Sequence, residues 1–187
     1  MLPPNAALLV VDAQAGFDDP WWGPRNNPAC DDHIATLVEA FSSTARPVVY
    51  VRHESLDPAS PLHRDQPGHA LKPYLERHTP ALVVTKQVNS SFHGTPDLHE
   101  WLRRADISSV VVAGITTNHC CETTARVGGN LGYDVWFALD ATHTFDRTVP
   151  DGNTMTANDL ARATATNLHG EFATVATTQE VLAVTVG

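Results

Sequence analysis

The apolar residues of the chain gather in six short runs that alternate with amphipathic segments. The run Val110–Val112 is β-branched and is closed by Gly114, which is typical of a strand buried on both faces. Continuous apolar strands that alternate with helical patterns predict a three-layer, doubly wound α/β fold. Its sheet would be mostly parallel and six-stranded, with helices on both faces. We expect the strands at residues 6–12, 47–52, 82–86, 110–112, 135–139 and 173–176.

Capping residues and helical spacing place five helices between these strands. Asp31 or Asp32 would cap the first helix, and the sequence Thr95-Pro96-Asp97 would begin the second. The third would begin near Cys120, and its two adjacent glycines predict close packing on the sheet or on another subunit. The fourth and fifth helices are expected at 155–168 and from Thr178. Residues 13–30 and 53–80 lack periodicity and are expected to be long loops, the second with one helical turn near 71–76.

Composition restricts the class of protein. The chain has 187 residues, is 42% hydrophobic and carries a net charge of −9, which indicates one globular domain spanning residues 1–187. The acidic charge argues against nucleic acid or an anionic membrane as a partner. No apolar run has the roughly 18 residues needed to span a bilayer, and residues 1–12 resemble a core strand rather than a signal peptide. Three cysteines, two of them adjacent, form no disulfide framework, so we expect a cytoplasmic protein.

Three chemically active side chains come at or just after the ends of predicted strands: Asp12, Lys86 and Cys120. Each alone has a simpler interpretation, respectively as a helix cap, a solvated lysine and a small core residue. A parallel sheet, however, brings all three to one edge, where ligands bind in doubly wound folds. A cysteine at a helix start would also have its thiolate stabilised by the helix dipole, and backbone N–H groups there can hold an oxyanion.

Three motifs resemble those of cysteine hydrolases of the isochorismatase-like superfamily, in its amidohydrolase branch. They are VVDAQAGF at residues 10–17, TKQVNSSF at 85–92 and GITTNHCCETTA at 114–125, and the likeness extends over about residues 5–180. The resemblance implies that Cys120, not Cys121, is the nucleophile, with Asp12 and Lys86 as its catalytic partners. It also implies a cis peptide bond between Ile115 and Thr116, with the backbone N–H groups of Thr116 and Cys120 forming the oxyanion hole.

The resemblance implies hydrolysis of a C–N bond in a small amide, carbamoyl or ureido substrate through a thioester. Two alternatives stay open. One is an isochorismatase-type vinyl ether hydrolase, whose reaction needs no thiol. The other is a non-catalytic oligomeric binding or redox-sensing protein that uses the adjacent cysteines. The expected partners are a small-molecule substrate and further copies of the chain, in a dimer or larger assembly, and no cofactor is expected.

Neighbouring residues are candidates to bind the substrate: Gln14, Phe17, Trp21, Arg25, Asn89 and Phe92. Gln14 could instead orient Asp12. Phe17 fits the core equally well, Trp21 and Trp22 fit a subunit interface, and Arg25 fits a structural salt bridge. His119 adjoins the nucleophile, although the resemblance assigns the base role to Asp12, and Asp140 and His143 are expected to be structural.

No metal is expected, because Arg52 stands where related nicotinamidases have a metal-binding aspartate. His53, His63 and His69 are the remaining candidate ligands, and no tight spacing links them.

Overall fold

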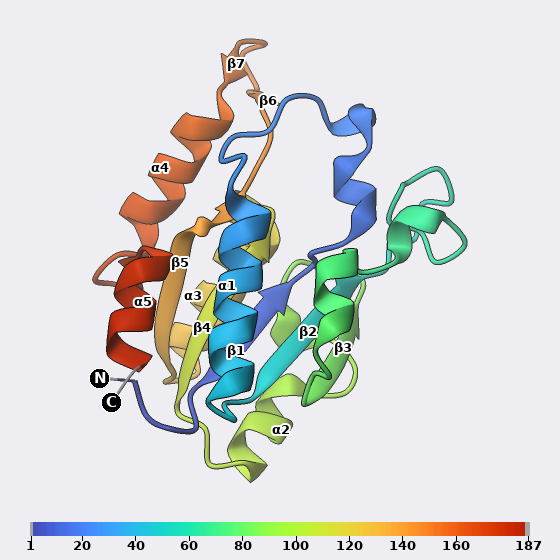
Figure 1. The fold of residues 1–187 in the computed structure, drawn as a ribbon. Coiled ribbons are helices and arrows are strands. Elements are labelled where there is room, and N and C mark those ends of the chain that lie inside the picture. The colour runs from blue at the N-terminus through green and yellow to red at the C-terminus, as the bar shows by residue number, and fades with distance from the viewer. Residues whose placement is uncertain (1, 186–187) are drawn as a thin grey trace.

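A computed structural model describes residues 2–185 of the chain and has a six-stranded parallel sheet at its centre (Figure 1). The strand order is β3-β2-β1-β4-β5-β8. Helices cover both faces, so the expected three-layer, doubly wound α/β fold is confirmed. The strands are β1 Ala7–Val11, β2 Val48–His53, β3 Leu82–Lys86, β4 Ser109–Ile115, β5 Asp134–His143 and β8 Thr174–Ala176.

Alternate side chains of the central strands feed two separate cores. Leu8 and Val10 of β1 point to the face covered by α1 (Cys30–Ser43) and α5 (Thr178–Thr185). Leu9 and Val11 point to the other face. That face is covered by α2 (Leu98–Arg104), α3 (Glu122–Asn130) and α4 (Ala157–Leu168). Burial on both faces explains why β1 and β4 are continuously apolar in the sequence.

The strand order reverses between β1 and β4. In doubly wound folds, ligands bind at the carboxyl ends of the strands beside such a reversal. Gly114 of β4 lies against β1 at this point, with φ of 132°. A Cβ atom on Gly114 would lie 1.9 Å from the carbonyl oxygen of Val11, so no other residue fits here. The close approach brings the ends of the two central strands together.

Two helices begin differently from the prediction. Helix α1 has Ala29 as its N-cap, without a side-chain cap, because the Asp31 carboxylate accepts hydrogen bonds from other residues. Helix α2 is capped by Asp97, which accepts a hydrogen bond of 2.9 Å from the Glu100 N–H. The Thr95–Pro96 peptide bond is cis, and the proline precedes the cap instead of following it.

The cysteine helix begins three residues earlier than expected, with a π-helical turn at Thr117–Cys121 that leads into α3. Its glycines pack within the subunit. A Cβ atom on Gly128 would lie 3.1 Å from the Val135 side chain of β5, and one on Gly129 would lie 2.6 Å from the Phe172 carbonyl oxygen. The expected close packing is therefore against the chain's own sheet and the segment after α4.

In the part of the chain that the structure describes, the loops contain five short 3₁₀ turns. The turn Pro73–Arg77 corresponds to the helical turn expected near 71–76. The periodicity did not predict the other four, which are Ala15–Asp18, Pro20–Trp22, Pro67–His69 and Ser91–His93. A small hairpin, β6 (Arg147–Thr148) and β7 (Thr154–Met155), projects beyond the sheet in Figure 1. Within residues 2–185, every helix is too short or too polar to cross a bilayer.

Candidate active site

Strand β1 delivers Asp12 to the sheet edge at the switch point. Its backbone has a φ of 50°, a left-handed conformation that aspartate adopts more readily than most residues. The Asp12 N–H still donates to the Val51 carbonyl oxygen at 2.9 Å, so the residue is tied to β2 as the chain turns. The side chain is fully buried. This sharp turn aims a carboxylate back into the protein instead of toward solvent.

Lys86, the last residue of β3, reaches past β2 to the same place. Its Nζ lies 2.6 Å from Asp12 Oδ2, and both side chains are completely buried. The other oxygen, Asp12 Oδ1, has no hydrogen-bond partner among the described residues. A buried ion pair is costly to desolvate, and an unsatisfied carboxylate oxygen adds to that cost. The arrangement therefore holds a carboxylate with one oxygen fixed and the other free to accept a proton.

Cys120 lies in the first helical turn after β4, above the end of β1. Its Sγ is 3.7 Å from Asn89 Oδ1. Potential ligand atoms of Asp12, His53 and Cys120 all lie within 4.8 Å of one another. Cys120 is 7% exposed, whereas its neighbour Cys121 is completely buried in the core. The structure thus brings the thiol, the carboxylate and the ammonium into one cluster and gives only Cys120, of the adjacent pair, access to it.

The surroundings of Cys120 disfavour its thiolate form. Burial, followed by the negative charge of Asp12, raises the pKa of Cys120, and the positive charge of Lys86 offsets this only in part. Burial alone would lower the pKa of Lys86, but the interactions with Asp12 and Cys120 raise it. Burial and the charge of Asp12 thus oppose the stabilisation of a thiolate that the helix end was expected to provide. These contributions favour a neutral thiol on Cys120 beside the Asp12–Lys86 ion pair.

The turn between β4 and the cysteine helix lies directly beside the thiol. The Ile115–Thr116 peptide bond is cis, as the resemblance implied. The Thr116 carbonyl oxygen accepts hydrogen bonds from the N–H groups of His119 and Cys121, at 3.3 and 3.2 Å. Thr116 is buried and contributes to the cavity wall. The N–H groups at the start of a helix lack partners within it, so this turn has donors for an anion.

A cavity of about 120 Å³ opens onto the thiol. Pockets for drug-sized ligands usually measure about 300–1,000 Å³, so this one fits a small molecule. One side is aromatic: Phe17 and Trp22 have ring centroids 4.9 Å apart, and the Trp22 Nε1–H donates to the Gly16 carbonyl oxygen. The lining residues are Phe17, Trp22, His53, Leu62, Asn89, Thr116, His119, Cys120 and Arg147.

Two of the six predicted substrate-binding residues, Phe17 and Asn89, line this cavity. Gln14 does not, and its side chain makes no hydrogen bond to the Asp12 carboxylate; only its backbone N–H donates to the Asp12 carbonyl oxygen, at 2.7 Å. Its amide accepts from the His53 N–H and donates to the carbonyl oxygens of His53 and His69, so it fixes the segment that carries His53. Phe92 packs in the core, where its ring stacks on Tyr133.

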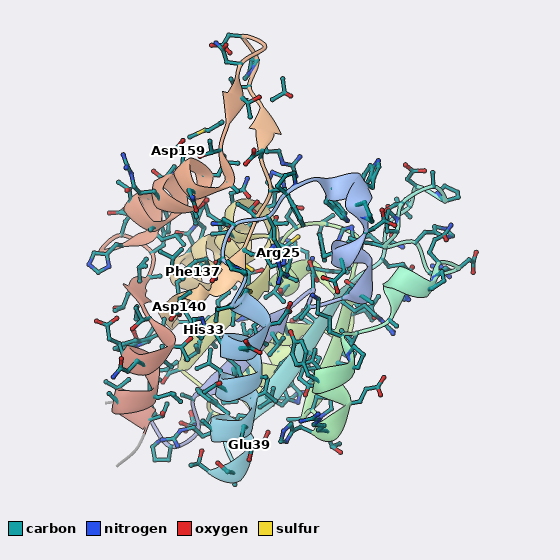
Figure 2. The ribbon with its side chains drawn as sticks, turned by 45° about the horizontal axis from the view of Figure 1, so that its top comes forward. Arg25, His33, Glu39, Phe137, Asp140 and Asp159 are labelled. Carbon is teal, nitrogen blue, oxygen red and sulfur yellow. The ribbon has the colours of Figure 1, made fainter. Side chains whose placement is uncertain are left out.

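Trp21 and Arg25 also lie away from the cavity. Trp21 is 67% exposed and contacts the edge of Trp22, the tryptophan that does line the wall. Arg25 pairs with Asp31 at 3.1 Å, which is the structural salt bridge that the sequence left open. Figure 2 labels Arg25 apart from His33 and Asp140, which lie beside each other near the N-terminal end of α1, with His33 Nδ1 3.6 Å from Asp140 Oδ2.

Asp140 and His143 are structural, as expected. The Asp140 carboxylate accepts hydrogen bonds from the N–H and hydroxyl of Thr178, where it fixes the start of α5. His143 is completely buried at the end of β5, with its ring edge-on to Phe145.

Leu62 and Arg147 belong to the cavity wall but carry no signal in the sequence. Leu62 comes from the aperiodic segment 53–80, and Arg147 from the small hairpin after β5. His53 and His119 also line the wall, although the sequence suggested them only as a metal ligand and as a neighbour of the nucleophile. Burial lowers the pKa of both histidines, helped by Lys86 at His53 and by Arg147 at His119.

Of the three candidate metal-binding histidines, His53 alone belongs to a cluster with the spacing of a metal site, among the residues that the structure describes. Its partners in that cluster are Asp12 and Cys120. The Lys86 ammonium lies 2.6 Å from Asp12 Oδ2 and 3.4 Å from His53 Nδ1. Because a fixed positive charge already contacts two of the three ligands, the cluster does not fit a metal cation.

Comparison with known proteins agrees with this geometry. The model of the isochorismatase domain matches residues 6–180. The uncharacterized isochorismatase family protein YrdC of Bacillus subtilis is 38% identical over 176 residues, which cover 94% of each chain. Nicotinamidase 3 of Arabidopsis thaliana is 29% identical over 163 residues, which cover 80% of this chain and 79% of the relative.

Solved structures give the same result. A hydrolase of the isochorismatase family from Chromobacterium violaceum has a TM-score of 0.92 and 38% identity, and the match covers 98% of this chain and 94% of that one. A cysteine hydrolase from Pseudomonas syringae has a TM-score of 0.86 and 29% identity, with coverage of 98% and 93%. Sequence, fold and site geometry agree, and the chain belongs to the isochorismatase family of hydrolases.

Proposed function

We propose that this hydrolase cleaves a C–N bond of a small amide, carbamoyl or ureido compound through a thioester on Cys120. One observation carries the proposal. Asp12 is held by Lys86 through one oxygen, and its other oxygen has no partner within residues 2–185. Both groups lie in a buried cluster with a thiol that faces a cavity. A base within reach of a nucleophile is the requirement for covalent catalysis.

In the first step Cys120 Sγ attacks the substrate carbonyl carbon while its proton passes to Asp12 Oδ1. The raised pKa of the thiol fits a transfer that accompanies the attack instead of preceding it. The carbonyl oxygen becomes an oxyanion, which the backbone N–H groups of Thr116 and Cys120 would hold. Lys86 keeps Asp12 oriented and compensates its charge in the buried site.

In the second step the tetrahedral intermediate collapses and the C–N bond breaks. Asp12 returns the proton to the departing nitrogen, so ammonia or a small amine leaves. A water molecule then attacks the thioester and gives its proton to Asp12. The C–S bond breaks, the sulfur regains a proton, and an acid leaves the cavity.

The two alternative functions account for fewer of these features. Vinyl ether hydrolysis does not use a thiol, so it leaves Cys120 at the cavity without a role. A redox pair is disfavoured because Cys121 is completely buried and adjacent cysteines rarely form an unstrained disulfide. The relative named nicotinamidase supports amide chemistry in the family.

We further propose a cytoplasmic setting, a homo-oligomeric assembly and catalysis without cofactor. The three cysteines are free, which suits a reducing compartment. The cavity's volume fits a small-molecule substrate.

An ammonia-release screen over small amides and ureido acids tests this function. For any substrate found, acid quenching during turnover followed by peptide mass spectrometry should show the acyl group on the peptide that contains Cys120. Hydroxylamine should remove the group, as expected of a thioester. Turnover with an acyl group on another residue would contradict the mechanism, and release of no ammonia across the screen would contradict the substrate class.

A further inference from the structure

Arg147 gives the cavity a positive charge that the proposed chemistry does not use. It is the first residue of β6, in the hairpin that follows β5, and its half-buried side chain lines the cavity together with Cys120. The hydrolytic steps need a nucleophile, a base and oxyanion donors, and all of these come from other residues. This guanidinium is therefore available to bind a group of the substrate that does not react.

The contact between Arg147 and His119 leaves that charge in place. Arg147 Nη2 lies 3.2 Å from His119 Nδ1. A guanidinium can only donate, so Nδ1 accepts and His119 is a neutral ring with its proton on Nε2. His119 thus holds the guanidinium in position without cancelling its charge, and it can itself donate a hydrogen bond.

The other charges of the site are already compensated. Lys86 is paired with Asp12, whereas none of the ion pairs formed within residues 2–185 involves Arg147. The chain as a whole carries a net charge of −9, which repels anions from its surface. A fixed, unpaired cation on the wall of a cavity in such a protein is a local site for an anion.

We propose that Arg147 binds a carboxylate of the substrate, which makes the preferred substrates small amides or ureido compounds that carry a carboxylate. A guanidinium offers two parallel donors that match the two oxygens of a carboxylate. The cavity of about 120 Å³ limits the distance between the scissile carbonyl and the carboxylate to a short chain. The neutral, aromatic side of Phe17 and Trp22 then covers the connecting carbons. This inference rests on the proposed function and specifies its substrate class.

A pair of amides of equal size tests the proposal by steady-state kinetics. Succinamate carries a carboxylate, and 4-methylpentanamide carries two methyl groups in place of the carboxylate oxygens. The wild-type protein should prefer succinamate. In Arg147→Met, kcat/KM for succinamate should fall about 100-fold, mainly through KM, because a charge-assisted pair inside a site is lost. Arg147→Lys should recover part of the loss, and activity on 4-methylpentanamide should not fall.

The matched control is Arg162→Met, which removes the same charge from the exposed surface of α4 and should change neither activity. Equal losses on both amides in Arg147→Met, or a wild-type preference for the neutral amide, would overturn the inference.

Binding to a protein that cannot turn over separates this inference from the proposed function. Calorimetric titration of succinamate into Cys120→Ala should show binding that Cys120→Ala/Arg147→Met lacks, whether or not the wild-type protein hydrolyses it. Turnover failing while this difference persists would count against the proposed reaction and support the anion site. Equal binding to the two variants, or none to either, would overturn the anion site.

Discussion

Lys86 Nζ lies 2.6 Å from Asp12 Oδ2 although Lys86 ends β3 and Asp12 follows β1, two strands that are separated in the sheet by β2. Both side chains are completely buried. Neither charge has access to water, so each depends on the other for compensation. The pair therefore links stability to the proposed reaction: the protein tolerates a buried carboxylate at the thiol because an ammonium from β3 is fixed beside it.

Removing one partner of this pair should destabilise the fold. In Asp12→Asn the Lys86 ammonium stays buried without a counter-charge, and the free energy of unfolding should fall by about 3–5 kcal/mol. Hydrolysis should also fall, by about 10²–10⁴-fold, because the general base is lost. Urea denaturation and ammonia release measure the two effects.

The double variant Asp12→Asn/Lys86→Met is the control for stability. It removes both charges, so it should be more stable than Asp12→Asn while remaining inactive. If the double variant lost as much unfolding free energy as Asp12→Asn and Lys86→Met lose together, the two charges would not be coupled as the structure indicates.

The Asp12→Asn variant should also make Cys120 more reactive toward iodoacetamide at neutral pH. The carboxylate's charge is one cause of the raised pKa of the thiol, and without it the Lys86 charge favours the thiolate. While the pKa stays above the assay pH, the thiolate fraction grows about tenfold for each unit by which the pKa falls. Labelling followed by mass spectrometry gives the rate for each cysteine.

Labelling and hydrolysis should therefore change in opposite directions in Asp12→Asn. Cys30 and Cys121 serve as internal controls, because both are completely buried and should stay unlabelled in the folded protein. A wild-type Cys120 that labels faster than a free cysteine, or a variant that labels more slowly, would contradict a neutral resting thiol.

The sequence predicted the cluster of Asp12, Lys86 and Cys120 because its members lie at or just after the ends of strands whose apolar pattern is unambiguous. Asp12 and Lys86 lie at the ends of β1 and β3, and Cys120 follows β4, so parallel strand direction alone brings them to one edge. The choice of Cys120 over Cys121 needed the family motif. The structure agrees with that choice through burial, since Cys121 lies in the core.

The wall of the cavity could not be predicted in the same way. Leu62 and Arg147 lie on segments whose path depends on tertiary contacts and not on local periodicity. Arg25 shows the converse: an arginine close in sequence to Asp12 pairs with Asp31 at the start of α1 and never reaches the cavity. The raised pKa of Cys120 could not be predicted from the sequence either, because its first cause is the burial of the thiol in the folded protein.

Acid should destabilise the protein through His143. Burial lowers the pKa of this histidine to about 3 from 6.5, and both ring nitrogens lack partners among the described residues. Between pH 6.5 and 3, His143 therefore binds a proton in the unfolded chain but not in the folded protein. Stability contributed by this site is present above pH 6.5 and falls by about 1.4 kcal/mol per pH unit below it.

The variant His143→Leu removes this titration. Urea midpoints between pH 7 and 4 should fall less steeply for His143→Leu than for the wild type. His93→Leu, at an exposed position, is the control and should leave the slope unchanged. Equal slopes for all three proteins would show that His143 is not excluded from protonation in the folded state.

The most direct test of the catalytic role of Cys120 compares two alanine variants of adjacent cysteines in the ammonia-release assay. We predict that Cys120→Ala loses activity by about 10³-fold or more, as expected on removal of a covalent nucleophile. Cys121→Ala, which removes a core thiol one residue away, should keep most of the activity of its folded fraction. A Cys120→Ala protein that still hydrolyses the substrate at the wild-type rate would contradict the account.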